Sequence, residues 1–138
     1  MDILLVEKDR LVRDQVKVGL QQFPDLKITT GEGYGGLNLL RQRSFDLLFL
    51  GLPGELVAAR KMLEYFRSID KSTDLVLVAP AKLTRDLAQE RSRFNIWSTL
   101  STPINVMDFF RLVARIRERL DLSSDAATKT RGARSAAV

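Results

Sequence analysis

The sequence contains neither cysteine nor histidine. The absence of cysteine excludes disulfide bonds and thiolate chemistry. Without either residue type, neither a zinc site nor a histidine-based catalytic triad is expected, and cations with oxygen ligands, such as Mg²⁺, are the metals that remain possible. A cysteine-free chain is compatible with a reducing compartment, so we expect a cytoplasmic protein.

Long apolar runs are missing as well. No run of 18 apolar residues occurs, and a predicted strand begins at residue 2, so we expect neither a membrane span nor a signal peptide. The formal net charge is +5. The segment from Leu122 contributes +2, because it holds Lys129, Arg131 and Arg134 against Asp125, which leaves +3 for the rest. So small an excess does not predict direct nucleic-acid binding.

Short apolar runs alternate with stretches of helical periodicity along the chain. They predict strands at residues 2–6, 26–30, 47–50, 74–79 and 96–101. Helices are predicted after the N-cap residue Asp9, after the glycine-rich segment 31–36, and over residues 56–68, 82–93 and 104–120. This alternation predicts an α/β fold with a doubly wound, five-stranded parallel sheet of the flavodoxin type, in the order 2-1-3-4-5. We expect one domain over residues 1–121 and a flexible basic tail or linker over residues 122–138.

The central predicted strand, residues 47–50, is apolar without interruption and is followed by Gly51, Leu52, Pro53 and Gly54. A strand that is apolar on both faces belongs in the middle of a parallel sheet, where helices cover both sides. Reacting groups in such folds gather beyond the carboxyl ends of the central strands. Position 51 is therefore expected at the functional edge, yet glycine has no side chain that could react.

Four motifs in a fixed order resemble the receiver domain of bacterial response regulators, the CheY-like family of two-component signal transduction. They are Ile-Leu-Leu-Val-Glu-x-Asp at 3–9, Gly-x-x-x-Leu at 33–37, Phe-Asp-Leu-Leu-x-Leu at 45–50 and Thr-Pro-Ile at 102–104. The resemblance extends over about residues 1–121. It lies in the joint order and spacing of the motifs rather than in any one of them.

The resemblance implies a phosphorylation pocket with four parts: an acidic pair that holds Mg²⁺, an aspartate acceptor, a hydroxyl, and a lysine before proline. A carboxylate nucleophile needs a cation, a hydroxyl and an ammonium around it because the incoming phosphoryl group is strongly charged. The corresponding positions in this chain are Glu7 with Lys8, followed by Asp9, then Gly51, Ala79, and Thr102 before Pro103. The resemblance thus implies a degenerate pseudo-receiver without catalytic residues, metal, cofactor or small-molecule substrate, and not an enzyme.

Two points about this pocket stay open in the sequence. Lys8 is either a surface lysine or an ammonium in the place of Mg²⁺, paired with Glu7 or Asp9. Another carboxylate is not expected to replace the acceptor, since Asp46 enters the strand about 15 Å away. Glu55 is nearer but has no lysine and hydroxyl arranged around it.

A glycine pattern supports an alternative function. Gly31, Gly33 and Gly36 match the Gly-x-Gly-x-x-Gly pattern of dinucleotide-binding folds. The pattern follows the second strand rather than the first, and no acidic residue ends a strand about 20 residues later. A flexible turn is the ordinary interpretation. The alternative is a nucleotide- or flavin-binding flavodoxin-like protein or enzyme, which an absorbance spectrum of the purified protein would reveal.

Arginines on the last predicted helix suggest a partner surface. Arg111, Arg115 and Arg119 follow at i, i+4 and i+8 and form one stripe. The stripe lies opposite an expected core face of Val106, Phe109 or Phe110, Val113, Ile116 and Leu120. A solvated face is the ordinary interpretation.

The resemblance gives that stripe a functional interpretation, because the family uses its fourth and fifth helices and fifth strand as an output or dimer face. Trp97, the only tryptophan, begins the fifth predicted strand, and a tryptophan beside arginines is typical of an interface hot spot. Arg85, Arg91 and Arg93 lie on the preceding helix. We therefore predict a phosphorylation-independent interaction module that binds a protein partner, or itself, through this face.

Overall fold

The computed structural model describes residues 1–120, and the predicted tail at 122–138 lies outside them. The chain divides into two units, Met1–Asn105 and Val106–Val138, which are described separately. Within the described residues, no helix is both long and apolar enough to cross a membrane.

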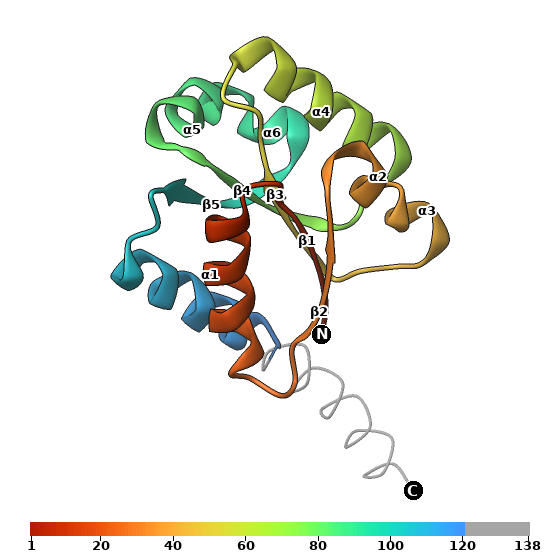
Figure 1. The fold of residues 1–138 in the computed structure, drawn as a ribbon. Coiled ribbons are helices and arrows are strands. Elements are labelled where there is room, and N and C mark those ends of the chain that lie inside the picture. The colour runs from red at the N-terminus through yellow and green to blue at the C-terminus, as the bar shows by residue number, and fades with distance from the viewer. Residues whose placement is uncertain (121–138) are drawn as a thin grey trace, which may run out of the picture. The chain divides into compact units, whose positions relative to one another are not determined.

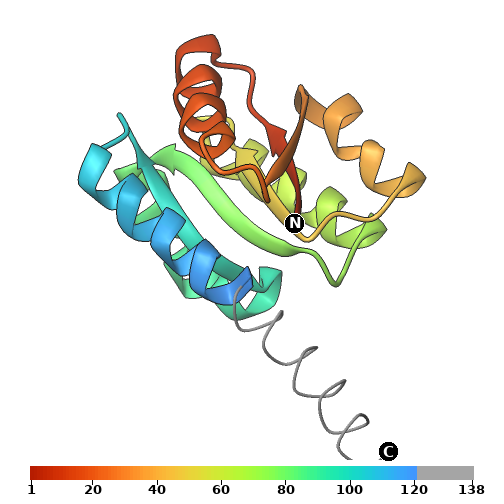
Figure 2. The ribbon, with the colours of Figure 1, turned by 90° about the horizontal axis from the view of Figure 1, so that it is seen from below.

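The first unit contains one parallel sheet of five strands, as predicted. The strands are β1 (Asp2–Val6), β2 (Lys27–Gly31), β3 (Leu47–Gly51), β4 (Asp74–Pro80) and β5 (Ile96–Thr102). Their order is β2-β1-β3-β4-β5, which confirms the predicted topology (Figure 1). Figure 2 shows the twist of the sheet from below. Because Val6 pairs with Leu50 and Gly51 with Val78, the carboxyl ends of β1, β3 and β4 share one edge.

Helices cover both faces of this sheet. They are α1 (Arg10–Gln21), α2 (Gly33–Leu37), α3 (Leu39–Gln42), α4 (Leu56–Ile69), α5 (Ala81–Leu87), the 3₁₀ turn η1 (Ala88–Glu90) and α6 (Arg91–Phe94). Figure 1 shows α1 on one face and α2 to α6 on the other. Asp9 caps α1, as predicted: its Oδ1 accepts a hydrogen bond from the Val12 amide at 3.2 Å. This two-sided cover explains why the central strands are apolar on both faces.

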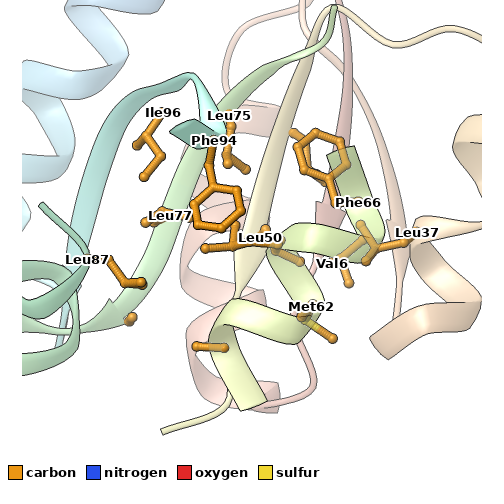
Figure 3. Packing of buried hydrophobic residues seen from close by; sticks show 14 of the residues in the cluster. Val6, Leu37, Leu50, Met62, Phe66, Leu75, Leu77, Leu87, Phe94 and Ile96 are labelled. Carbon is orange, nitrogen blue, oxygen red and sulfur yellow. The ribbon is translucent and has the colours of Figure 1, made fainter. Parts of the chain in front are cut away.

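Alternate residues of each central strand enter different halves of the core. Leu48 and Leu50 of β3 belong to the cluster under α2 to α6, where Phe66 of α4 is also fully buried (Figure 3). Phe49, between them, is buried outside that cluster and points to the other face. On α1, Val16 and Leu20 are buried, whereas Leu11 and Val18, which share its apolar periodicity, are exposed.

The predicted helix at 82–93 is wrong as a single element, because the chain forms α5, η1 and α6 instead. Only Leu83, Leu87 and Phe94 of this stretch are buried, so little apolar contact holds one helical axis. Asn95 ends α6 in the left-handed conformation at φ 50°. The helix predicted after the glycine-rich segment is likewise divided into α2 and α3 at Asn38.

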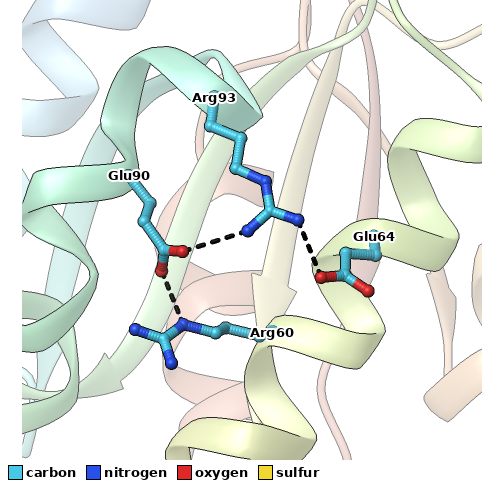
Figure 4. A network of polar contacts seen from close by, with 4 residues as sticks. All are labelled: Arg60, Glu64, Glu90 and Arg93. Atoms are coloured by element: carbon cyan, nitrogen blue, oxygen red, sulfur yellow. Dashed lines mark hydrogen bonds and ion pairs between the residues drawn. The ribbon is translucent and has the colours of Figure 1, made fainter.

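Polar side chains hold α6 to α4. Arg67 of α4 donates hydrogen bonds to four backbone carbonyl oxygens around the end of α6 and the start of β4. A second network joins Arg60 and Glu64 of α4 to Glu90 and Arg93 (Figure 4). Its ion pairs measure 2.8 Å for Arg60 to Glu90, 3.1 Å for Arg93 to Glu90, and 2.8 Å for Arg93 to Glu64. These contacts replace the apolar packing that the divided segment lacks.

In the second unit, residues 106–120 form a helix. Its buried side chains, Phe109, Leu112, Val113 and Ile116, share one face. The predicted core face is wrong at Val106, which is 62% exposed, and confirmed at Val113 and Ile116. Of the two alternatives Phe109 and Phe110, Phe109 is the buried one and Phe110 is 57% exposed. A step of about 100° per residue turns Phe110 away from the buried face.

Candidate functional site

Most of the residues at the pocket positions predicted from the resemblance meet at the carboxyl edge of the sheet. Two cavities lie there, of about 180 and 280 Å³, and Glu7 and Lys8 line both. The smaller cavity also includes Gly51, and the larger also includes Asp9, Ala79 and Thr102. Pro103 follows β5 through a cis peptide bond and is exposed. The positions predicted from the resemblance are thus brought together, except for Pro103, which lines neither cavity.

Glu7 is the buried acidic group of this site. It follows β1 directly, and only 9% of its surface is exposed. Its Oε1 accepts a hydrogen bond from the Asp9 amide at 2.9 Å. Burial raises the pKa of the Glu7 carboxyl, while backbone hydrogen bonds from Asp9 and Lys8 oppose the rise. Burial removes water from around the Glu7 carboxylate, and this loss of hydration disfavours its charged form.

The position of that carboxylate depends on the glycine at position 51. A Cβ atom built on Gly51 would lie 2.9 Å from Oε1 of Glu7, with Oε2 and Cδ nearer still. Real Cβ atoms do not approach other heavy atoms so closely. The Glu7 side chain therefore occupies the space in which a side chain at position 51 would begin. The sequence identified both residues but gave no indication that one fills the place of the other.

The donor set does not suit Mg²⁺, which requires several oxygen ligands in near-octahedral geometry. Among residues 1–120, no group of three or more acidic side chains could hold a metal ion. The Glu7 carboxylate lies against Gly51, and Asp9 caps α1. Lys8 is exposed, and within this described part it forms no ion pair with Glu7 or Asp9. The direct pairing that would place its ammonium in the metal position is not observed.

The glycine pattern at 31–36 has a packing role. A Cβ atom on Gly31 would lie 2.7 Å from the Cα of Gly36, so a larger residue at either position would separate β2 from α2. Gly33 has a φ of +54°, which favours glycine. Close backbone approach and turn geometry thus account for the three glycines.

The predicted partner residues occur in both units. Trp97 lies in β5, partly buried, and its carbonyl accepts a hydrogen bond from Arg91 at 2.7 Å. On the helix at 106–120, Arg111 and Arg115 are exposed and Arg119 is partly buried, so the stripe is less uniformly exposed than predicted. Arg111 forms an ion pair with Asp108 at 3.3 Å, as the solvated-face interpretation expects.

Sequence analysis missed the exposed apolar residues of that helix. Val106, Met107 and Phe110 are all more than half exposed. The sequence predicts only one of Phe109 and Phe110 in the core, because two adjacent phenylalanines cannot both face one core from a helix, but it places Val106 on the core face.

No protein-family model matches the sequence, and no curated protein matches it. Solved structures do match its fold. The regulatory domain of the repressor of iron transport regulator, RitR, solved in its inactive form, is 21% identical over 87% of this chain and 94% of its own, with a TM-score of 0.67. The REC domain of AraT, a response regulator from Geobacillus stearothermophilus, is 17% identical over 89% and 97%, with a TM-score of 0.71.

The chain has the receiver fold. A third receiver-fold match is described as belonging to a family of redox sensors in the streptococci that evolved from two-component response regulators. It is 20% identical over 90% of this chain but only 54% of that protein, with a TM-score of 0.69. The structural similarity, with TM-scores of 0.67 to 0.71, establishes the fold. At these low identities the chemistry has to be argued from the residues at the carboxyl edge.

Proposed function

We propose that this chain is a pseudo-receiver, a module that binds a protein partner or a second copy of itself without being phosphorylated. The observation that carries the proposal is the Glu7 carboxylate lying against Gly51. The acceptor position has no nucleophile, and its space already holds a negatively charged group. We assign the function to residues 1–121, with 122–138 as a tail, and expect no enzymatic activity.

The other pocket positions support the same proposal. Ala79 is buried and has no hydroxyl to offer a phosphoryl oxygen. Thr102 stands where an ammonium would be needed, and the lysine that lines both cavities, Lys8, is exposed. A phosphoryl group arriving here would meet a buried carboxylate without a fixed counter-charge, which is strongly unfavourable.

The streptococcal redox sensors support a second aspect of the proposal. Their description as descendants of two-component response regulators is a precedent for a receiver fold with another kind of input. A thiol-based input is excluded for this chain, which has no cysteine. We therefore favour protein contacts, in a bacterial cytoplasm, through Trp97 and through the helix that carries Arg111, Arg115 and Arg119.

The first prediction concerns phosphorylation. The purified protein, incubated with acetyl phosphate and Mg²⁺, should show no added mass in intact-protein mass spectrometry, because Gly51 offers no nucleophile. Gly51→Asp should also remain unmodified, since the new side chain must first displace Glu7 and still lacks a lysine. A receiver domain that retains its aspartate serves as the positive control. A stoichiometric, acid-stable and base-labile adduct on the wild type would refute the proposal.

The second prediction concerns the arginine stripe. Changing Arg111 and Arg115 together to Glu should weaken partner capture or self-association and leave the circular dichroism spectrum unchanged, because both side chains are exposed. Raised salt should weaken the wild type in the same assay, since exposed charges act over a Debye length of about 8–10 Å. Arg10→Glu, on the exposed side of α1, is the matched control. If the double variant binds the same partners as strongly as the wild type, the arginine stripe is only solvated surface and the prediction is wrong.

A further inference from the structure

A third cavity, of about 240 Å³, lies away from the carboxyl edge, and residues of α5, η1, α6, β4 and β5 line it. All of these residues belong to the unit Met1–Asn105. The buried side chains of Leu77, Leu87 and Ile96 form its apolar floor. Figure 3 shows these three gathered on the β4–β5 side of the core. Thr99 and Arg85, both exposed, stand at its rim.

The size of this cavity limits what can occupy it. Sites for small molecules usually measure about 300–1,000 Å³, and this one is smaller. A hollow of this volume suits one large apolar side chain, the anchor that typically carries much of the binding energy at a protein interface. The cavity stays open because Thr99, which pairs with Leu77 across β4 and β5, is too short to cover the floor.

The rim of the cavity carries positive charge that the described residues do not neutralise. Within residues 1–120, Arg85 forms no ion pair, and Arg91 donates only to the carbonyl oxygens of Ile96 and Trp97. Glu90, next to Arg91 in the chain, is engaged by Arg60 and Arg93 instead (Figure 4). The polar network that holds α6 to α4 thus engages Glu90, the acidic neighbour of Arg91 in the chain.

We propose that this cavity receives one large apolar side chain, of aromatic size, from a protein segment with a carboxylate beside it. The apolar side chain covers Leu77, Leu87 and Ile96, and the carboxylate pairs with Arg85. The inference rests on the proposed interaction function and specifies the chemistry of the partner that the module binds.

The test is selection of a display library of random linear peptides on the purified chain. The selected peptides should share an aromatic residue next to Asp or Glu. Thr99→Phe fills the cavity and Arg85→Glu reverses the rim charge, so each should weaken the selected peptides about tenfold or more. Thr99→Val keeps the cavity open, and Lys82→Glu reverses an exposed charge of α5 that does not line the cavity, so both should bind as the wild type does.

A measurement on the wild type makes the test independent of how any variant folds. Titration with a selected peptide should shift the backbone NMR signals of Leu87, Ile96 and Thr99. Peptides that bind without shifting these signals, or that tolerate Thr99→Phe, overturn the cavity proposal and leave the interaction function standing. If the library yields no binding peptide at all, the cavity proposal is overturned and the proposed interaction function loses support with it.

Discussion

Arg67→Ala should lower the free energy of unfolding by about 2–4 kcal/mol, one of the largest losses expected from a side chain outside the apolar core. The guanidinium donates to the carbonyl oxygens of Phe94 at 2.7 Å, Thr73 at 2.9 Å, Asn95 at 3.0 Å and Asp70 at 3.3 Å. Removing it leaves the first, second and fourth of these acceptors, which are partly buried, without this donor, while the exposed Asn95 carbonyl can turn to water. In a domain of this size the loss corresponds to a melting temperature lower by roughly 6–15 °C.

The surroundings of Arg67 lower the pKa of its guanidinium on balance. Burial lowers the pKa of its guanidinium, and the nearby Asp70 and Asp74 raise it. Arg67→Lys keeps a charge but lacks the planar fork, so its melting temperature should fall between those of wild type and Arg67→Ala. Arg10→Ala is the control, because that side chain is 87% exposed and its loss should change stability by less than about 0.5 kcal/mol. If Arg67→Ala melts like Arg10→Ala, water replaces the donor and the interpretation is wrong.

Glu7→Gln should raise stability at neutral pH, on the order of 1 kcal/mol, although it removes a charged residue. The amide can still accept the hydrogen bond from the Asp9 backbone, and it has no charge to desolvate. Burial raises the pKa of Glu7 in the folded state. Between the pKa of the unfolded chain and that of the folded state, folding is therefore coupled to protonation of this carboxyl. The contribution of Glu7 to the free energy of unfolding is most favourable below the pKa of the unfolded chain, and this advantage is lost as pH rises through the folded-state pKa.

Thermal melts from pH 4 to pH 8 would measure the effect. The melting temperature of Glu7→Gln should exceed that of wild type at pH 7 to 8, and the difference should shrink toward pH 4. Glu90→Gln provides the opposite sign, since hydrogen bonds from Arg60 and Arg93 lower the pKa of Glu90. Glu90→Gln should have a lower melting temperature than wild type at neutral pH, and the difference should shrink as the pH falls. A destabilised Glu7→Gln at pH 7 would mean that a cation neutralises this carboxylate.

The sheet could be predicted from the sequence because its strands are short apolar runs between glycine, proline and polar residues. Every predicted strand lies within about one residue of the observed one, and the order follows from the topology of doubly wound sheets. The segment after β4 could not be predicted, since it is held by Arg60, Arg67 and Arg93 through contacts with groups distant in the sequence. Contacts made by long polar side chains leave no periodic pattern in the sequence, so they cannot be predicted as hydrophobic periodicity can.

The candidate site was predictable in composition but not in geometry. The resemblance placed Glu7, Gly51, Ala79 and Thr102 at one edge, and the structure brings them together. That Glu7 turns onto Gly51 depends on a rotamer and on the space a missing Cβ leaves, which no sequence pattern records. The cavity beside Thr99 was also missed, because it results from one short side chain over a floor assembled from three separate elements.

Because the Glu7 side chain overlaps the space of a side chain at position 51, substitutions at these two positions are expected to occur in a particular order. A lineage that acquired an aspartate at position 51 would first have to shorten or redirect residue 7, because the intermediate with both side chains long is disfavoured. Glu7 is also the buried acidic residue of the part of the chain that the structure describes, so replacing it with a residue that lacks a carboxylate would remove a ligand that a metal site at this edge could use. Positions 7 and 51 are therefore coupled: an aspartate at position 51 becomes tolerable only after residue 7 has changed.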